Sequence, residues 1–240
     1  MRRIRGKNLN SGEYFDQVFR HNFDLYDNYQ NIKHYDSKYG LGLFSGDSYL
    51  DYGCGGGWGL SEIKKEKPHL NIYGVDISEY CISQNRKKYP TCNFLTVEEF
   101  TKSNFPIGHI LSSHTFEHVD GPKNLATCLL GRAGSTLTII VPYQNSWSDC
   151  AEHLWRFNRR SFDFLKPTLV IRGLTNQAGN TEIVFHWEKD AAKAQEKVRK
   201  FNLTNPERYL KAKLWTRLKR ILPASVKRSL KAALPSSRPS

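Results

Sequence analysis

Two histidines and a glutamate lie close together in the run SSHTFEHVD at residues 112–120. His114 and His118 are four positions apart, and Glu117 directly precedes the second histidine. On a helix, residues with this spacing share one face, where they can hold a zinc ion. The same order of ligand, base and ligand occurs in inverted zinc proteases. Whether these residues bind a metal therefore depends on the elements around them.

A second run able to do chemistry is the glycine-rich stretch YLDYGCGGGW, which begins at Tyr49. Gly53, Gly55 and Gly57 directly follow an apolar run, and glycines in this place let the backbone approach a ligand closely. Asp76 ends the next apolar run, where a carboxylate can accept both hydroxyls of a ribose. Glycine clusters also form plain turns and aspartates also cap helices, but the order and spacing together indicate a nucleoside-containing ligand.

Short apolar runs alternate with helical patterns through the middle of the chain. We expect strands at residues 49–52, 71–76, 92–95, 109–113 and 135–142, and helices at 57–66, 78–89 and 121–130. This alternation is typical of an α/β fold with a doubly wound, mostly parallel sheet. Two β-rich runs, at 167–173 and 181–187, have no helix between them and predict a terminal hairpin. The expected sheet has seven strands, and its last strand is antiparallel to the others.

The segments that flank this sheet differ from it in composition. Residues 13–39 are aromatic, polar and roughly helical in spacing, so residues 1–44 are expected to form a helical cap before a domain at 45–190. The net charge is +13, but residues 189–240 hold 15 Lys and Arg against 3 Asp and Glu, and the rest of the chain 21 against 20. Positive charge is therefore concentrated in a basic helical tail at 191–240.

The basic tail carries an apolar stripe. Leucines recur every four positions between residues 208 and 222, Lys and Arg fill the other positions, and a weaker repeat extends to residue 234. This pattern is typical of a helix that lies in an anionic membrane surface. RNA binding through phosphates is a weaker alternative, and docking on the protein itself is another. Because no apolar stretch follows the basic start and no run is long enough to span a membrane, we expect a cytoplasmic protein, peripheral at the inner face of the membrane.

The pattern Asp51-x-Gly53-x-Gly55-x-Gly57, followed by Asp76, resembles that of class I S-adenosylmethionine-dependent methyltransferases. The resemblance implies that S-adenosyl-L-methionine is the cofactor, that the glycine loop faces its methionine part and that Asp76 binds its ribose. It also implies an antiparallel seventh strand. The residues expected to bind the cofactor are Asp51, Gly53, Cys54, Gly55, Gly57, Asp76, Ile77, Glu98, Ser113 and His114.

Two positions depart from the pattern of this family. The fourth strand commonly starts with Phe-Asp in these enzymes, whereas here it starts with Gly108 and His109. The acidic residue that the family places against the adenine is matched best by Glu98, with Thr96 as an alternative. The adenine contact is therefore the least specific part of the resemblance.

The resemblance also accounts for the histidine run at 112–120. In many of these methyltransferases a segment resembling H-x-x-E-H-V-x-x-P follows the fourth strand and lines the cofactor pocket next to the transferred methyl group. The matching residues are His114, Glu117, His118, Val119 and Pro122. A zinc protease would need a long helix and a distant third ligand, and the five cysteines form no C-x-x-C pair. We therefore expect no metal.

Transfer of a methyl group to a hydroxyl is helped by a general base, for which histidine is the usual residue. His153 is the first candidate, because it follows the fifth predicted strand near the expected substrate loops, and His118 is the second. Tyr143 can orient the substrate. The alternative for His153 is a packing role only.

Aromatic side chains and three arginines are concentrated at residues 147–164. They predict either an acceptor site, in which rings stack on a sugar and Arg156, Arg159 and Arg160 meet phosphate, or a helix with a solvated basic face. The expected function is methyl transfer to a small-molecule or glycan hydroxyl, such as that of a lipid-linked sugar in cell-surface polysaccharide synthesis. The alternatives are an RNA methyltransferase that uses the tail and a cofactor-fold scaffold without transfer activity.

Overall fold

The computed structural model describes residues 1–4, 9–23, 29–143, 150–175 and 181–204. The chain divides into two compact units, Met1–Lys197 and Val198–Ser240. The first unit contains every strand of the described residues. Most of the basic tail, from residue 205 onward, lies outside the described residues, so its predicted helix stays a prediction.

The seven strands of the main sheet follow the order β4-β3-β2-β5-β6-β9-β8. They are β2 (Ser48–Tyr52), β3 (Asn71–Asp76), β4 (Asn93–Thr96), β5 (Ile107–Ser113), β6 (Ala133–Pro142), β8 (Leu169–Thr175) and β9 (Thr181–Glu188). The first five run parallel, and β9 runs antiparallel to both of its neighbours, β6 and β8. The predicted seven-stranded α/β sheet with an antiparallel terminal strand is confirmed.

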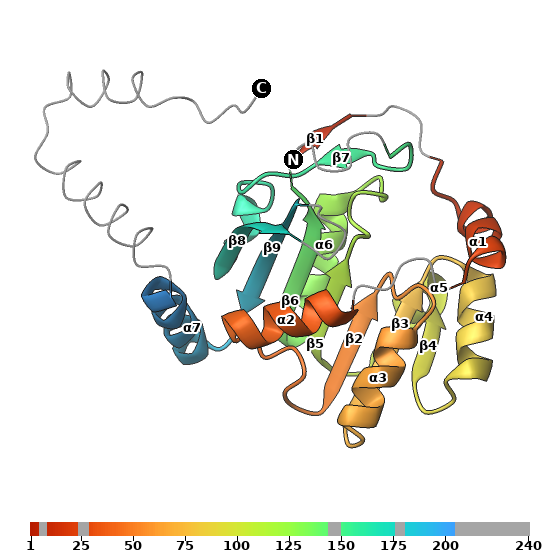
Figure 1. Ribbon diagram of the computed structural model, residues 1–240, viewed down its shortest axis with the longest axis horizontal. Coiled ribbons are helices and arrows are strands. Elements are labelled where there is room, and N and C mark those ends of the chain that lie inside the picture. Colours follow the sequence, from red (N-terminus) through yellow and green to blue (C-terminus); the bar gives the residue numbers. More distant parts are fainter. Residues whose placement is uncertain (5–8, 24–28, 144–149, 176–180, 205–240) are drawn as a thin grey trace, which may run out of the picture. The chain divides into compact units, whose positions relative to one another are not determined.

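Helices cover both faces of this sheet. The helices of the described residues are α1 (Gly12–His21), α2 (Tyr29–Tyr39), α3 (Trp58–Glu66), α4 (Glu79–Lys88), α5 (Val97–Lys102), α6 (Pro122–Arg132) and α7 (Ala191–Thr204). In Figure 1, α2 and α3 cross the near face of the sheet. Among the described residues, no helix combines the length and the apolar character needed to cross a membrane.

The two faces of the sheet follow from the alternation of side chains along each strand. Leu50 and Val75 point toward one core cluster, which includes residues of α5 and α6. On the other face, a Cβ built on Gly74 would lie within 2.8 Å of Leu60 in α3 and Phe94 in β4. The glycine therefore lets α3 pack directly on the middle of the sheet, so that the loop before α3 lies at the strand ends.

The short helix α5 and the two-residue strands β1 (Arg2–Arg3) and β7 (Trp155–Arg156) have no counterpart in the sequence-based prediction. At the start of α5, Thr96 and Glu99 form a capping box, which stabilises even a short helix. β1 pairs antiparallel with β7.

The alternative of a helix at residues 147–164 is wrong for the described part, 150–164. That part consists of turns, the extended strand β7 and a single 3₁₀ turn at Asp163–Leu165. The backbone around Leu154 bonds to other segments, because Ile4 N donates to Leu154 O and Leu154 N donates to Glu117 O.

Candidate active site

The glycine loop follows β2 and has a backbone that only glycine adopts easily. Gly53, Gly55 and Gly57 have φ values of 87°, 51° and 69°, in the left-handed region that disfavours residues with a Cβ. A Cβ on Gly53 would also lie 1.9 Å from the Thr115 hydroxyl oxygen. Gly53 N and Cys54 N both donate to Val75 O, which ties the loop to the end of β3. The sequence thus builds a tight turn between β2 and α3.

Asp76 closes the other side of this loop. One of its carboxylate oxygens accepts from Gly55 N at 2.9 Å and the other from Ser78 N at 3.0 Å. The residue is 7% exposed, and this burial raises the pKa of Asp76 although the two main-chain bonds oppose the rise. Each carboxylate oxygen has a second lone pair, so Asp76 can still accept hydroxyls of a ribose while it holds the loop.

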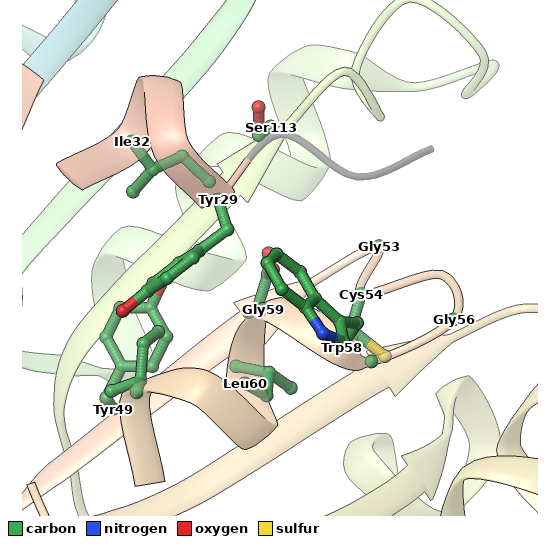
Figure 2. A pocket seen from close by; sticks show the side chains of 13 residues that line it. Tyr29, Ile32, Tyr49, Gly53, Cys54, Gly56, Trp58, Gly59, Leu60 and Ser113 are labelled. Carbon is green, nitrogen blue, oxygen red and sulfur yellow. The ribbon is translucent and has the colours of Figure 1, made fainter. Parts of the chain in front are cut away.

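A pocket opens beside the glycine loop, between α2, α3 and the end of β5. It is lined by five residues of the predicted cofactor set, Asp51, Gly53, Cys54, Gly57 and Ser113. Figure 2 shows Tyr29 of α2 and Trp58 of α3 among the residues that line it, and their rings meet edge-on with centroids 5.8 Å apart. The structure therefore brings together the residues that the sequence assigns to the methionine side of the cofactor.

The predicted adenine contacts lie farther along the same edge. The side chain of Ile77 is exposed, as expected of a residue that covers a ligand. Glu98 forms an exposed ion pair with Lys102, and Thr96 caps α5 by accepting from Glu99 N. Glu98 and Thr96 both line a second pocket, between α4 and α5. The choice between them stays a prediction.

His114 is held between two buried glutamates, one of which the sequence analysis missed. Its Nε2 lies 2.8 Å from Glu182 Oε1 and its Nδ1 lies 3.2 Å from Glu117 Oε1. The other oxygen of Glu182 accepts from Tyr35 Oη at 2.6 Å. Burial alone lowers the pKa of His114, but the hydrogen bonds and charges of the two glutamates outweigh burial and raise it to about 10. His114 is therefore an imidazolium at neutral pH.

Glu182 reaches this site because of the direction of β9. Parallel strands end at the carboxyl edge, whereas an antiparallel strand begins there, and Glu182 pairs with Pro142 at the end of β6. The hairpin predicted from the sequence contained this signal, since a charged residue at the start of its second strand must lie at the same edge as the other site residues. Tyr35 carries no such signal, because its place depends on how α2 crosses the sheet.

The two candidate bases lie against each other. The ring centroids of His118 and His153 are 5.0 Å apart, at an interplanar angle of 75°. Burial lowers the pKa of His153, and the neighbouring charge of Glu117 opposes that change. One ligand atom from each of Glu117, His118 and His153 can be chosen so that all three lie within 4.8 Å of one another. The two histidines predicted from the sequence thus form a trio with the buried carboxylate of Glu117.

The N-terminal helix α1 lies beside this trio. The ring of Phe15 meets that of His118 edge-on, with centroids 5.8 Å apart. Tyr14 Oη donates to the carboxylate of Glu152, which directly precedes His153. Asp16 accepts from Ser78 Oγ at 2.5 Å and from Tyr80 N at 3.0 Å at the start of α4. One helix therefore connects the ribose side of the edge with the histidines.

The remaining predicted acceptor residues differ in their positions. Tyr143 forms an isolated bridge with Phe157, close to the end of β6. Arg156 is half-buried in β7, and Arg159 and Arg160 are exposed in the turn that follows. Their contacts with an acceptor phosphate stay predictions.

A family model described as a methyltransferase domain matches residues 25–165, which is more than half of the chain. The matched span contains the glycine loop, Asp76 and the histidine trio. The chain belongs to this methyltransferase family. No curated protein matches its sequence significantly.

Solved structures of S-adenosylmethionine-dependent methyltransferases share the fold of this methyltransferase. One is a SAM-dependent methyltransferase from Anabaena variabilis, with a TM-score of 0.57 and 11% identity over 78% of this chain and 98% of that chain. Another is the plantazolicin methyltransferase BpumL in complex with a triazolic desmethylPZN analog and SAH, with a TM-score of 0.56 and 16% identity over 72% and 91%. A third is magnesium protoporphyrin IX methyltransferase (ChlM) from Synechocystis PCC 6803 with bound SAM, with a TM-score of 0.50 and 13% identity over 75% and 85%.

At these sequence identities, the similarity to the solved structures shows the fold alone. The methyltransferase activity follows from the match to the family model. The methyltransferase is an enzyme with S-adenosylmethionine as its cofactor. Its own residues fit that cofactor, because the carboxylate of Asp76 and a pocket lined by Asp51 and Ser113 both lie beside the left-handed glycine loop. The acceptor is not defined by these relationships.

Proposed function

We propose that this methyltransferase transfers a methyl group to a hydroxyl of a small molecule or glycan. The observation that carries the proposal is the contact between His118, which follows β5, and His153, which precedes β7. Carboxyl and amine acceptors need less help, because a carboxylate is already deprotonated and an amine has its own lone pair. A hydroxyl acceptor benefits most from a group that removes its proton.

Different residues of the chain serve different steps of such a transfer. The bound cofactor supplies an activated methyl group, so that the protein must mainly position and deprotonate the acceptor. Burial lowers the pKa of His153, so its imidazole is neutral near pH 7 and can accept a proton. The imidazolium of His114 lies between Glu117 and Glu182. Glu117 in turn lies close to the pair, with one ligand atom of each of the three residues within 4.8 Å of the others.

The proposed acceptor class includes lipid-linked sugars. Support comes from the basic, leucine-striped tail at residues 208–234, which lies outside the described residues and suits an anionic membrane surface. We therefore propose a cytoplasmic enzyme that contacts the inner face of the membrane through this tail. No feature of the described residues favours RNA as the acceptor over a glycan.

A labelled-methyl assay tests the acceptor class directly. Full-length protein is incubated with S-adenosylmethionine that carries a labelled methyl group, together with separate lipid-linked glycan, polar small-molecule and RNA fractions. The proposal expects label in a glycan or small-molecule product as an alkali-stable ether. Label in RNA alone, or in an alkali-labile ester, would contradict it.

A further inference from the structure

We propose that Glu117, His118 and His153 form a binding site for a divalent transition-metal ion. Among the described residues, this is the one group of three or more His, Cys, Asp and Glu side chains arranged closely enough to hold an ion. The sequence analysis expected no metal because the His114–His118 run had no third ligand. Folding supplies that ligand from a different segment, since β7 and the turn before it are bonded to the run at Glu117 O.

The distances suit a single ion after small side-chain rotations. One carboxylate oxygen and two imidazole nitrogens lie within 4.8 Å of one another. Two ligands at about 2.0–2.2 Å from a common ion can be no more than about 4.4 Å apart. The two histidine rings are steeply inclined, at 75°, which lets both direct a nitrogen at one point without stacking.

Two buried polar atoms of the trio indicate that a ligand binds there. Glu117 Oε2 and His118 Nδ1 are buried and have no hydrogen-bond partner among the described residues. The whole side chain of Glu117 is 0% exposed. A buried polar atom without a partner costs about 1–3 kcal/mol, more if it is charged, so such atoms are rare in native proteins. A bound ion would satisfy both atoms at once.

The surroundings of Glu117 match those of a metal-binding carboxylate. Such ligands are commonly held in turn by hydrogen bonds from outer residues. Here His114 Nδ1 lies 3.2 Å from Glu117 Oε1, and His114 is itself fixed by Glu182 and Tyr35. One oxygen is therefore occupied, and the other is buried without a hydrogen-bond partner among the described residues. This chain of four residues explains why Glu117 can be buried and still present a charged oxygen.

The donor set selects the class of metal. Two imidazole nitrogens and one carboxylate suit zinc, iron, manganese, cobalt or nickel, whereas magnesium and calcium prefer oxygen ligands alone. Three protein ligands also leave coordination positions open. An ion at this site could therefore bind a further oxygen from water or from an acceptor.

The role of the ion, unlike its binding, rests on the proposed function. An acceptor hydroxyl bound to the ion has a lowered pKa and loses its proton to water. The resulting oxygen attacks the methyl carbon, the C–S bond breaks with its electron pair on sulfur, and the products are a methyl ether and S-adenosylhomocysteine. In this arrangement His153 is a ligand of the ion, and the ion, instead of His153, makes the hydroxyl reactive.

Titration of chelator-treated, full-length protein with Co²⁺ tests the site without any acceptor. Calorimetry and the visible absorption of bound Co²⁺ report the number of ions and their ligands. We expect one Co²⁺ per chain with a nitrogen and oxygen environment. Substitutions outside the ligand shell usually weaken metal binding about 10–100-fold. Glu117→Gln and His118→Ala should each weaken Co²⁺ binding by more than this, and His114→Gln should weaken it within this range. The exposed His69→Ala is the matched control and should leave Co²⁺ affinity unchanged.

The affinity for S-adenosylmethionine, measured on the same preparations, shows that each variant is folded and separates the two proposals. Unchanged Co²⁺ affinity in the His118→Ala protein, thiolate absorption bands, or no binding to the parent protein would overturn the metal site. Hydroxyl methylation in a protein that binds no Co²⁺ would leave the proposed function standing with His153 as the base. Co²⁺ binding in a protein that methylates only carboxylates or RNA would leave the metal site standing without that function.

Discussion

The cofactor side of the carboxyl edge, between β2 and β3, is built from main chain and one carboxylate. Its groups come from the short stretch between Asp51 and Asp76. The acceptor side, from β5 to β9, is built from side chains of four distant segments. They are Tyr35 in α2, the run after β5, His153 before β7 and Glu182 in β9.

This difference matches what each side must recognise. The backbone of the loop is fixed by glycine φ values and by its hydrogen bonds to Val75 and Asp76, so it suits a cofactor that does not change. A cluster of side chains can be altered one residue at a time and suits an acceptor that differs between relatives. The same contrast predicts that substitutions on the two sides affect different steps.

The largest effect is expected on the acceptor side. His153→Ala should lower turnover of the acceptor found in the labelled-methyl assay by about 10²–10⁴-fold, because the hydroxyl loses the group that makes it reactive. The affinity for S-adenosylmethionine should stay the same. Initial rates at saturating cofactor measure this, with His69→Ala as the control. A normal rate in the His153→Ala protein would mean that this side does not act on the acceptor.

The next effect is expected in the glycine loop. Gly53→Ala places a Cβ where the φ is 87° and the Thr115 oxygen would be only 1.9 Å away. Strain of this kind costs about 1–3 kcal/mol of unfolding free energy, and the displaced loop should also bind the cofactor more weakly. Gly131 in α6 is exposed, with no atom within 4 Å of an added Cβ.

Gly131→Ala is therefore a matched control, expected to stabilise the protein by up to about 1 kcal/mol. Urea unfolding of both variants measures the contrast. Equal stability of the two variants would show that the loop is not constrained as described.

A smaller effect concerns pH. The pKa of His114 is raised from 6.5 to about 10 in the folded protein, so its stabilisation is complete below pH 6.5 and is lost as the pH rises toward 10. Unfolding free energy should therefore decline as the pH rises across this window. His114→Gln should remove the decline. Urea unfolding at pH 6 to 10 measures it, and parallel profiles for the two proteins would contradict the charged His114.

The smallest effect on the site is expected from loss of the tail. Removal of residues 205–240 should leave the affinity for S-adenosylmethionine unchanged, because every residue that lines the cofactor pocket lies in the unit Met1–Lys197. Binding to anionic vesicles should be lost, and in the full-length protein it should weaken but persist at high salt. Flotation with anionic and neutral vesicles measures this. Full-length protein that ignores anionic vesicles but binds RNA through the tail would favour the RNA alternative.

The fold and the cofactor side could be predicted because their signals are local. The glycine loop directly follows β2 and Asp76 ends β3, the next strand along the chain. Alternation of apolar runs with helices determines a parallel sheet. The helix α5 was missed although its capping box, Thr96 with Glu99, is visible in the sequence. β1 and β7 have two residues each, too few for any periodicity.

The acceptor side could be predicted only in part because it depends on contacts between distant segments. His118 and His153 were chosen as separate bases, each for its place after a strand. Their contact with one another and with Glu117 arises from the bond between Leu154 N and Glu117 O. The role of Glu182 follows from the antiparallel direction of β9, and the role of Tyr35 from the path of α2.

The division of the carboxyl edge into a cofactor side and an acceptor side is tested most directly by calorimetric titration with S-adenosylmethionine. The proteins compared are the parent protein, Asp76→Ala and His118→Ala. Asp76→Ala removes a charged acceptor worth roughly 1.5–3 kcal/mol, so its affinity should fall by about ten- to a hundredfold. His118→Ala should bind the cofactor as the parent protein does. Unchanged affinity in the folded Asp76→Ala protein, or an equally large loss in His118→Ala, would contradict a cofactor side and an acceptor side with separate functions.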